Sequence, residues 1–320
     1  MGKIILANDG IDAAGKAILE KEGHTVLTDK VAQEELAGFI NDKQVAALLV
    51  RSATKVRKDI IDACRGLDII GRAGVGMDNI DVAYAREQGK TVLNTPGASS
   101  QSVAELVFAH LFGVSRFIGD AAREMPLHGT TKFNDLKKVY SNGFELKGKT
   151  LGIIGFGRIG QSTATMALGL GMNVLPFDPS VNEVTLELDF FHTEDTFSIE
   201  YKTVALEEVF RKSDFITVHV PGTKDGKALI GKEEIEMMKP GVVLVNTARG
   251  GVIDENALLD GLNSGKVGFA CLDVFVNEPS PMEALLKHPR VSATPHIGGS
   301  TREAQERIGI ELATLVAAAL

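Results

Sequence analysis

The sequence lacks, or has little of, the residues that mark several classes of protein. It has no Trp, 3 Tyr and 2 Cys among 320 residues, and 42 Asp and Glu outnumber 34 Lys and Arg. A net charge of −8 argues against nucleic acid or a membrane surface as a partner recognised by net charge alone. No apolar run approaches the ~18 residues of a membrane helix, so we expect no membrane partner.

The two cysteines, Cys64 and Cys271, stand far apart, and neither belongs to a CxxC pair or a cluster with metal-ligand spacing. Each lies beside an apolar run, which favours a buried free thiol over a catalytic thiol. Isolated cysteines suit a reducing compartment, and the N-terminal MGKIILANDG has neither the length nor the cleavage site of a signal peptide. We therefore expect a cytoplasmic protein with no bound metal.

What the sequence does contain is a repeated alternation of short apolar runs and helix-period segments, typical of an α/β protein. Runs such as VAALLV lack polar alternation, as expected for parallel strands covered on both faces. Strands are predicted over 3–7, 25–28, 45–50, 68–71 and 91–94, then over 150–154, 173–177, 215–219, 242–246, 269–273 and 291–293. Helices are predicted over 13–22, 32–41, 58–64, 82–88, 159–170 and 300–320.

Three further segments are predicted from the same patterns. Residues 102–123 form one long amphipathic helix with a Ser-rich start, residues 125–149 form an irregular surface excursion containing Pro126 and Gly129, and residues 184–203 have no clear periodicity. The fold class expected is two doubly wound parallel-sheet domains, a flavodoxin-like one and a Rossmann one. We expect a discontinuous substrate-binding domain from 1–98 and 292–320, and an NAD-binding domain over 99–291.

Residues 155–160 read GFGRIG between a predicted strand and a predicted helix, and Asp178 ends the following strand. This context is typical of a dinucleotide-binding site, in which the helix N-terminus faces the pyrophosphate. Gly155 permits the tight turn, Gly157 the close approach of the phosphates, and Gly160 the packing of helix on strand. A carboxylate at Asp178 accepts hydrogen bonds from the ribose hydroxyls of NAD and would repel the 2′-phosphate of NADP. The alternative is a Gly-rich turn that merely begins a helix.

Further motifs follow in a fixed order: AGVGMDNID (73–81), HVPGT (219–223), NTARGGVIDE (246–255), DVFVNEP (273–279) and TPHIGGST (294–301). With these motifs, the chain closely resembles the D-isomer-specific 2-hydroxyacid dehydrogenase family over essentially its whole length. The resemblance implies an NAD-dependent enzyme. It also implies a homodimer that packs through its NAD-binding domains, for which 102–123 is the candidate interface.

The chemistry of three residues can be argued from their types. Oxidation of a 2-hydroxy acid needs a base for the hydroxyl proton, and histidine is a residue type that can accept and release a proton near neutral pH. His296 lies in a loop beside a predicted strand end. Glu278 would hold the imidazole in the required tautomer, and Arg249 would clamp the substrate carboxylate and polarise the carbonyl oxygen. Taken singly, each of the three is as well explained by a salt bridge or a cap. The family assigns these same roles to its matching residues.

The resemblance also implies which residues approach the ligands. On the cofactor side these are Val75, Gly155, Gly157, Arg158, Ile159, Gly160, Asp178, Val220, Pro221, Thr247, Ala248, Arg249, Asp273, His296, Gly298 and Gly299. On the substrate side they are Arg51, Ser52, Arg72, Gly74, Val75, Gly76, Arg249 and His296.

Within the family, VRSATKV (50–56), GRAGVGMDNID (71–81) and HIGGSTREAQER (296–307) are most similar to the phosphoglycerate dehydrogenase branch. That branch oxidises a phosphorylated 2-hydroxy acid, D-3-phosphoglycerate, in the first step of serine biosynthesis. Arg51 and Arg72 would supply the positive charge that a phosphate needs, although Arg51 could instead cap a strand end. Lys137 or Lys138 would stand in for a basic residue usual before residue 150. Many members of the branch carry C-terminal regulatory domains, and we expect no serine feedback through such a domain here.

Two other functions remain open. A relative that acts on glyoxylate, hydroxypyruvate or D-lactate would need no second cationic group beyond Arg249, because these substrates have one charged end. An NAD-sensing corepressor of the same fold would show almost no NADH formation. A metal enzyme is disfavoured because no cluster has ligand spacing.

Overall fold

The computed structural model describes residues 2–189, 196–222 and 226–320, and the chain divides into two compact units. The first unit consists of Met1–Ser102 with Gly299–Leu320, and the second of Val103–Gly298. Each contains a parallel sheet, which confirms the α/β class expected from the sequence. Residues 99–102 were expected in the second unit and lie in the first, and residues 292–298 were expected in the first unit. Residues 292–298 lie in the second, because strand β13 (Val291–Ala293) pairs with β12 (Val267–Leu272).

The first unit is built on five parallel strands in the order β2-β1-β3-β4-β5. The strands are β1 (Ile4–Ala7), β2 (Thr25–Leu27), β3 (Val45–Val50), β4 (Ile69–Arg72) and β5 (Thr91–Asn94). The helices are α1 (Ala13–Lys21), α2 (Leu36–Asp42), α3 (Lys58–Ala63), α4 (Val82–Glu87) and α13 (Arg302–Ala319). Strand order reverses between β1 and β3, the point at which doubly wound sheets bind ligands.

Helices cover both faces of this sheet. On one face Ala47 and Leu49 of β3 pack in a cluster with Leu312 of α13, and on the other Leu48 and Val50 pack with residues of α2 and α3. Every residue of β3 is buried, which explains its lack of polar alternation.

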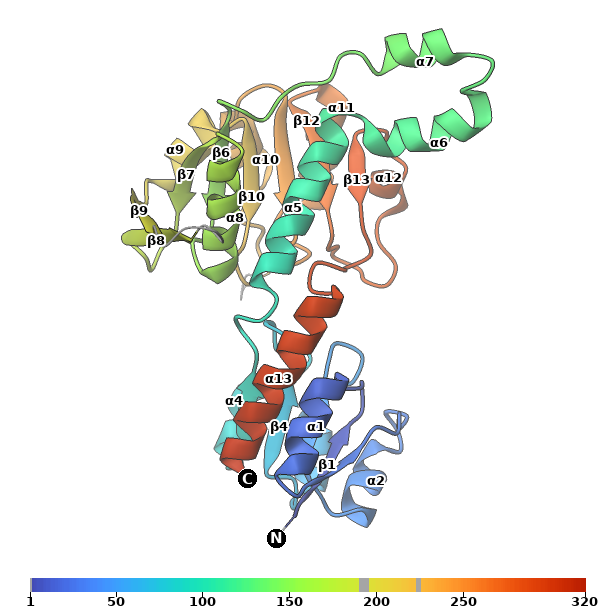
Figure 1. Ribbon diagram of the computed structural model, residues 1–320, viewed down its shortest axis with the longest axis vertical. Coiled ribbons are helices and arrows are strands. Elements are labelled where there is room, and N and C mark those ends of the chain that lie inside the picture. Colours follow the sequence, from blue (N-terminus) through green and yellow to red (C-terminus); the bar gives the residue numbers. More distant parts are fainter. Residues whose placement is uncertain (1, 190–195, 223–225) are drawn as a thin grey trace. The chain divides into compact units, whose positions relative to one another are not determined.

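Helices α1 and α13 pack closely in the first unit, as Figure 1 shows in blue and red. A Cβ added to Gly15 would lie 2.4 Å from the carbonyl oxygen of Gly309, so this crossing depends on the absence of side chains. The N-terminal and C-terminal segments of the chain therefore share one core.

The second unit is built on six parallel strands in the order β13-β12-β11-β10-β6-β7. Besides β12 and β13, the strands are β6 (Thr150–Ile154), β7 (Asn173–Phe177), β10 (Phe215–Val218) and β11 (Val242–Asn246). The helices are α5 (Ser100–Ser115), α6 (Ile118–His128), α7 (Phe133–Val139), α8 (Arg158–Gly169), α9 (Leu206–Lys212), α10 (Lys232–Met237), α11 (Glu255–Ser264) and α12 (Glu283–Leu286). Strand order reverses between β6 and β10.

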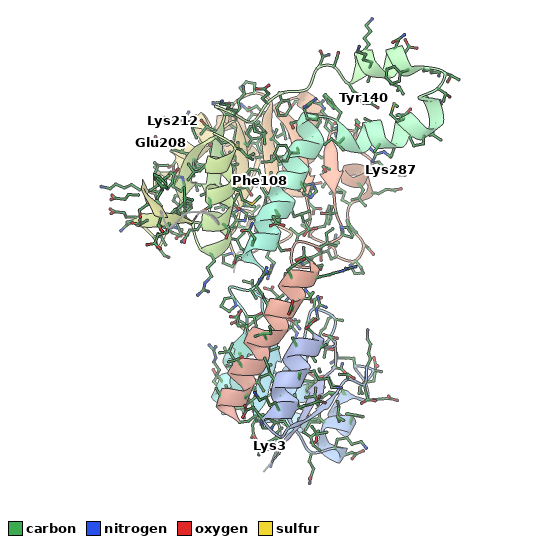
Figure 2. The ribbon with its side chains drawn as sticks, viewed as in Figure 1. Lys3, Phe108, Tyr140, Glu208, Lys212 and Lys287 are labelled. Carbon is green, nitrogen blue, oxygen red and sulfur yellow. The ribbon has the colours of Figure 1, made fainter. Side chains whose placement is uncertain are left out.

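The two faces of this sheet carry separate core clusters. Helices α5 and α8 cover one face, where Phe108 of α5, labelled in Figure 2, is buried with Ala164 of α8. Residues of α9, α10, α11 and α12 cover the other, including Phe210 and Leu258. The motif-bearing loops thus begin from strands fixed on both sides.

The single helix predicted over 102–123 is wrong, because α5 ends at Ser115 and α6 begins at Ile118 with a bend of 55°. Phe117 between them has a left-handed backbone (φ 54°), and its ring packs at 6.1 Å from Tyr140 and 6.2 Å from Phe269. The helical periodicity of the sequence continues through the break, so the pattern could not reveal it.

Two segments are more regular than predicted. Residues 125–149 contain the end of α6 and all of α7, which Figure 1 shows standing away from the sheet of the second unit. Residues 184–203, apart from 190–195 outside the described residues, form an antiparallel hairpin of β8 (Glu183–Asp189) and β9 (Thr196–Lys202). The alternating Val184, Leu186 and Leu188 were the missed indication of a strand.

Among the described residues, no single helix is long and apolar enough to cross a membrane, and only α5 and α6 together reach that length and composition. The apolar residues of α5 are accounted for by its place in the core, where Val107 and Leu111 are fully buried. Both cysteines are buried free thiols, as expected.

Candidate active site

The predicted residues of the second unit follow the carboxyl ends of neighbouring strands. The GFGRIG turn follows β6, His219 and Val220 follow β10, Arg249 follows β11, Asp273 follows β12, and His296 follows β13. Since these strands are parallel and adjacent, the loops lie along one edge of the sheet, where doubly wound folds bind ligands.

The GFGRIG turn has the shape that a bound pyrophosphate requires. Gly155 has φ 93° and a Cβ there would lie 2.5 Å from the carbonyl oxygen of His219, while a Cβ on Gly160 would lie 2.2 Å from that of Gly155. Side chains are thus excluded inside the turn. A Cβ on Gly157, the N-cap of α8, would meet nothing within 4 Å, so the helix N-terminus is open to a ligand on this side.

Asp178 follows β7 and is fixed by two backbone amides. Its Oδ2 accepts from the N–H of Phe156 at 2.7 Å, and its Oδ1 accepts from the N–H of Ser180 at 2.8 Å. A carboxylate has about four acceptor sites, so two remain for the hydroxyls of a ribose. The carboxylate is held against the Gly-rich turn, as a dinucleotide site needs.

Other predicted cofactor residues surround the same edge. Val220 lies beside Gly155, and Thr247 is buried with a hydroxyl that has no partner among the described residues. An unpartnered buried hydroxyl is costly unless a ligand pairs with it. Arg158 is exposed in the first turn of α8. Thr223, the last residue of HVPGT, lies outside the described residues. The open turn, the fixed carboxylate and the buried hydroxyl together fit NAD.

His296 and Glu278 form a pair. The Nδ1 of His296 lies 2.8 Å from Oε2 of Glu278, whose Oε1 accepts from the N–H of Phe275 at 2.9 Å. The ring of His296 is 46% exposed. Since Glu278 holds Nδ1, the opposite nitrogen, Nε2, is left to exchange a proton with a substrate. The two residues that the sequence proposed as an acid/base dyad are therefore in direct contact.

Arg249 is held by its own loop. Its Nη1 donates to the carbonyl oxygen of Ala248 at 2.6 Å, and its carbonyl oxygen accepts from Nδ2 of Asn246 at 2.8 Å. Asn246 also accepts from the N–H of Ala248 through Oδ1. The last residue of β11 thus fixes the turn that carries the arginine.

Asp273 is buried and organises the loop that carries His296. Its Oδ1 accepts from Thr294 Oγ1 at 2.6 Å and from the N–H of Ile297 at 2.8 Å, and its Oδ2 accepts from the N–H of Gly298 at 2.8 Å. His296 has a left-handed backbone (φ 54°), and its N–H donates to the carbonyl oxygen of Asp273 at 2.9 Å. The structure therefore gives Asp273 a positioning role besides the cofactor contact expected of it.

The predicted substrate residues Arg51, Ser52, Arg72, Gly74, Val75 and Gly76 all lie in the first unit, as does the cofactor residue Gly299. Val50, which precedes Arg51, pairs with Arg72 across β3 and β4, so the two arginines lie at neighbouring carboxyl ends. Arg72 donates through Nη1 to the carbonyl oxygen of Ala73 at 3.1 Å, beside Gly74. Ser52 and Val75 are exposed.

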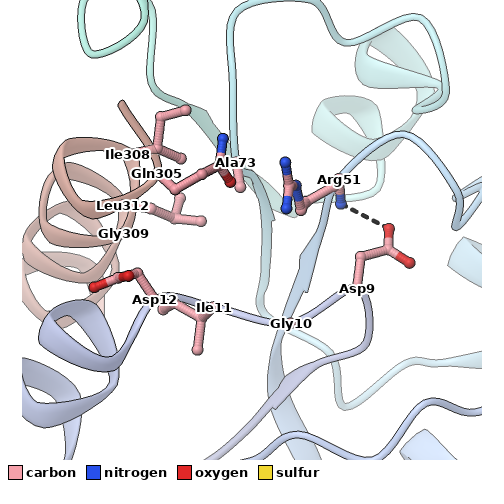
Figure 3. Close-up of a pocket in the computed structure, with 10 residues that line it drawn as sticks. All are labelled: Asp9, Gly10, Ile11, Asp12, Arg51, Ala73, Gln305, Ile308, Gly309 and Leu312. Carbon is pink, nitrogen blue, oxygen red and sulfur yellow. Dashed lines mark hydrogen bonds between the residues drawn. The ribbon is translucent and has the colours of Figure 1, made fainter. Parts of the chain in front are cut away.

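Arg51 lines a pocket of about 270 Å³ at the reversal point between β1 and β3 (Figure 3). Its side chain points into the pocket, which Gln305 and Ile308 of α13 also line. The loop after β1 contributes Asp9 and Asp12, two acidic residues that no sequence motif indicated.

Asp9 and Asn79 hold the loop 51–54 at both ends. Asp9 accepts from the N–H of Arg51 at 2.7 Å and of Thr54 at 3.1 Å, and Nδ2 of Asn79 donates to the carbonyl oxygens of the same two residues, each at 2.7 Å. Asp9 lies two residues after the end of β1, and a polar residue at the carboxyl end of a parallel strand is the sequence signal that could have identified it.

Comparison with known proteins agrees with this geometry. The sequence model of the D-isomer specific 2-hydroxyacid dehydrogenase, NAD binding domain, matches residues 108–298. A hydroxypyruvate reductase of Thermotoga maritima is 46% identical over 309 residues, which cover 95% of this chain and 94% of the relative. A D-3-phosphoglycerate dehydrogenase of Methanocaldococcus jannaschii is 41% identical over 306 residues, 95% of this chain and 55% of the relative.

The chain thus spans about half the length of the phosphoglycerate dehydrogenase and nearly all of the hydroxypyruvate reductase. Among solved structures, a glyoxylate reductase from Paecilomyes thermophila is similar with a TM-score of 0.82 and 30% identity, covering 99% of this chain and 95% of that one.

Proposed function

The chain belongs to the D-isomer specific 2-hydroxyacid dehydrogenase family, and we propose that it interconverts D-3-phosphoglycerate and its 2-keto acid. Its cofactor is NAD, for which Asp178 and the GFGRIG turn provide the site. The family membership supports a D-2-hydroxyacid dehydrogenase, and the arginines of the first unit support the phosphorylated substrate.

Residues of the second unit would carry the chemistry. In the oxidative direction the hydroxyl proton passes to Nε2 of His296 as C2 becomes a carbonyl. Glu278, bound to Nδ1, stabilises the imidazolium that results. Arg249 holds the substrate carboxylate and polarises the C2 oxygen. NAD, when bound, supplies the acceptor for the hydride that leaves C2.

The main support for a phosphorylated substrate is the position of Arg51. Its guanidinium points into the pocket at the reversal point of the first sheet, and no hydrogen bond or ion pair of that guanidinium is found among the described residues. The nearby carboxylate of Asp9 already accepts three hydrogen bonds from the loop 51–54. A guanidinium with no partner among the described residues suits an anionic group of a ligand.

Replacement of Arg51 by Ala tests this substrate. A charge-assisted contact with phosphate contributes about 1.5–3 kcal/mol, so KM for D-3-phosphoglycerate should rise by about 10- to 150-fold. Use of D-glycerate, which lacks the phosphate, should barely change. Arg86→Ala is the matched control, since this arginine is exposed on α4 and lies outside the pocket. Equal loss with both substrates would assign Arg51 to the carboxylate or to the fold.

Hydroxypyruvate reduction is the second candidate, favoured by the 46% identity to the Thermotoga maritima enzyme over nearly its whole length. The two candidates differ in one measurable ratio, kcat/KM for 3-phosphohydroxypyruvate over kcat/KM for hydroxypyruvate, with NADH. If the ratio is well above one in the native protein and falls strongly in Arg51→Ala, the phosphorylated substrate is supported. If the ratio is below one in the native protein and does not change in Arg51→Ala, hydroxypyruvate is supported.

A homodimer in the cytoplasm is part of the proposal. Of thirteen large apolar side chains that are exposed in the described part of the chain, six lie between residues 112 and 139 on α5, α6 and α7. They are Phe112, Ile118, Met125, Leu127, Phe133 and Val139. Clustered exposed apolar residues are typical of an interface, and a second copy of the chain would cover them. Light scattering should give twice the chain mass for the native protein and a smaller mass for Leu127→Lys with Phe133→Lys.

A further inference from the structure

A buried histidine of the second unit lies beside the loop that carries His296. His110 of α5 is 4% exposed, and both of its ring nitrogens have partners. Nδ1 lies 2.8 Å from Oγ of Ser292, and Nε2 lies 3.1 Å from Oγ1 of Thr294. Both partners belong to β13 or directly follow it, and neither the motifs nor the proposed reaction explains why a histidine stands here.

The direction of each hydrogen bond follows from the groups involved. The carboxylate of Asp273 accepts from Oγ1 of Thr294 at 2.6 Å, and a hydroxyl has one proton to donate. Thr294 must therefore accept from Nε2 of His110, which carries the ring proton, and Nδ1 accepts from Ser292. Burial lowers the pKa of His110, which is consistent with this neutral ring.

The chain of hydrogen bonds ends at the loop of His296. Asp273 accepts from Thr294 through one oxygen, and its two oxygens also accept from the amides of Ile297 and Gly298, each at 2.8 Å. These amides follow His296 directly. The orientation of one carboxylate thus depends on His110 at one end and fixes the residues after His296 at the other.

We propose that His110 is a positioning residue for the reaction: through Thr294 and Asp273 it fixes the loop that presents His296. The role of His296 rests on the proposed function, whereas the linkage from His110 to the loop does not. A buried polar group that merely filled space would be replaced by an apolar residue without effect on that loop.

The first experiment measures hydrogen exchange and needs no substrate. In His110→Leu, the amides of Ile297 and Gly298 should exchange about 10- to 100-fold faster, because the Thr294 hydroxyl that donates to Asp273 loses the N–H donor that fixes its position. Leu111→Ala is the matched control, since Leu111 is fully buried on the same helix and outside the network. Unchanged exchange at these two amides in His110→Leu, or the same increase in Leu111→Ala, overturns the proposal.

The second experiment measures NADH oxidation with the better of the two keto acids. His110→Leu should lower kcat by about 10- to 100-fold, since small displacements of a reacting group are costly. His110→Gln, which keeps a terminal N–H donor, should recover most of the loss. Leu111→Ala should lower the melting temperature and leave kcat of the folded protein unchanged. A loss that Gln does not recover overturns the proposal.

Thr294→Val breaks the same chain of hydrogen bonds between His110 and Asp273. This variant keeps the proposal testable if His110→Leu does not fold. Its effects on exchange and on kcat should equal those of His110→Leu, and the double variant should add little to either. If the losses of kcat in the two single variants multiply in the double variant, the linkage between His110 and Thr294 is refuted. If the native protein oxidises NADH with none of these acids, the proposed function fails while the exchange result still decides the linkage.

Discussion

The pair formed by Glu278 and His296 allows one substitution to be worked out from its hydrogen bonds. Glu278 uses both oxygens as acceptors, one for the N–H of Phe275 and the other for Nδ1 of His296. Gln at this position has one oxygen and one NH2 group. If its oxygen keeps the amide of Phe275, its NH2 faces Nδ1 and forces the ring proton onto Nε2, the nitrogen that must be free to accept a proton.

The magnitude follows from the distance and the exposure. Nδ1 of His296 lies 2.8 Å from Oε2 of Glu278 and the side chains are 46% and 35% exposed, so the imidazolium formed in the reaction and the carboxylate would be substantially solvated. With an effective dielectric constant of about 40–80, their attraction is about 1.5–3 kcal/mol, which corresponds to a fall of about 10- to 150-fold in kcat for Glu278→Gln. The altered tautomer would add to this loss.

The assay is oxidation of NADH with a keto-acid substrate in four proteins: native, Glu278→Gln, His296→Ala and the double variant. Because Glu278 acts through His296, Glu278→Gln should have no further effect in the His296→Ala background. Binding of NADH, measured by fluorescence, should remain nearly native in all four. A loss of less than about threefold, or an equal loss with and without His296, would refute the dyad.

Three further outcomes follow from the second unit. Asp178→Ala should reduce the preference for NAD over NADP, chiefly by lowering kcat/KM for NAD. Comparable kcat/KM values for the two cofactors in the native protein would show that Asp178 does not select NAD. Gly160→Ala should lower the melting temperature and NADH affinity together, because its Cβ would lie 2.2 Å from the carbonyl oxygen of Gly155; full retention of both would contradict the close packing. Burial lowers the pKa of His219 to about 3, so the folded state resists a proton that the unfolded state takes up near pH 6.5. The free energy of unfolding should thus fall by up to about 1.4 kcal/mol per unit as pH drops below 6.5, and urea titrations should show a shallower fall for His219→Gln.

Some parts of the molecule could be predicted from the sequence because a local pattern determines them. The continuous apolar run of β3 correctly predicted a strand that is buried on both faces. The GFGRIG motif with Asp178 correctly predicted a turn whose shape depends on glycines a few residues apart. The contact between Glu278 and His296 could be anticipated from the resemblance to a family and from the chemistry of the residues. Its geometry depends on where β12 and β13 end.

Other parts depend on contacts that no local pattern encodes. The break at Phe117 is fixed by rings of Tyr140 and Phe269, distant in the sequence, and the helical periodicity runs through it unchanged. His110 looked like one more residue of an amphipathic helix, because its partners lie more than 180 positions away. The alternation of Val184, Leu186 and Leu188 with Thr185 and Glu187 was present in β8 and was missed.

The packing of α1 against α13 has a consequence for the order of events during synthesis. The first unit needs both Met1–Ser102 and Gly299–Leu320, whereas the second is one continuous stretch, Val103–Gly298. On the ribosome, the whole second unit emerges while the first still lacks the helix that covers one face of its sheet. The strands of residues 4–94 therefore keep apolar residues such as Ile5 and Leu49 incompletely covered until residues 299–320 have been translated. The usual order, in which the part translated first also folds first, is therefore reversed for these two units: Val103–Gly298 can be complete before the unit that contains residues 1–102.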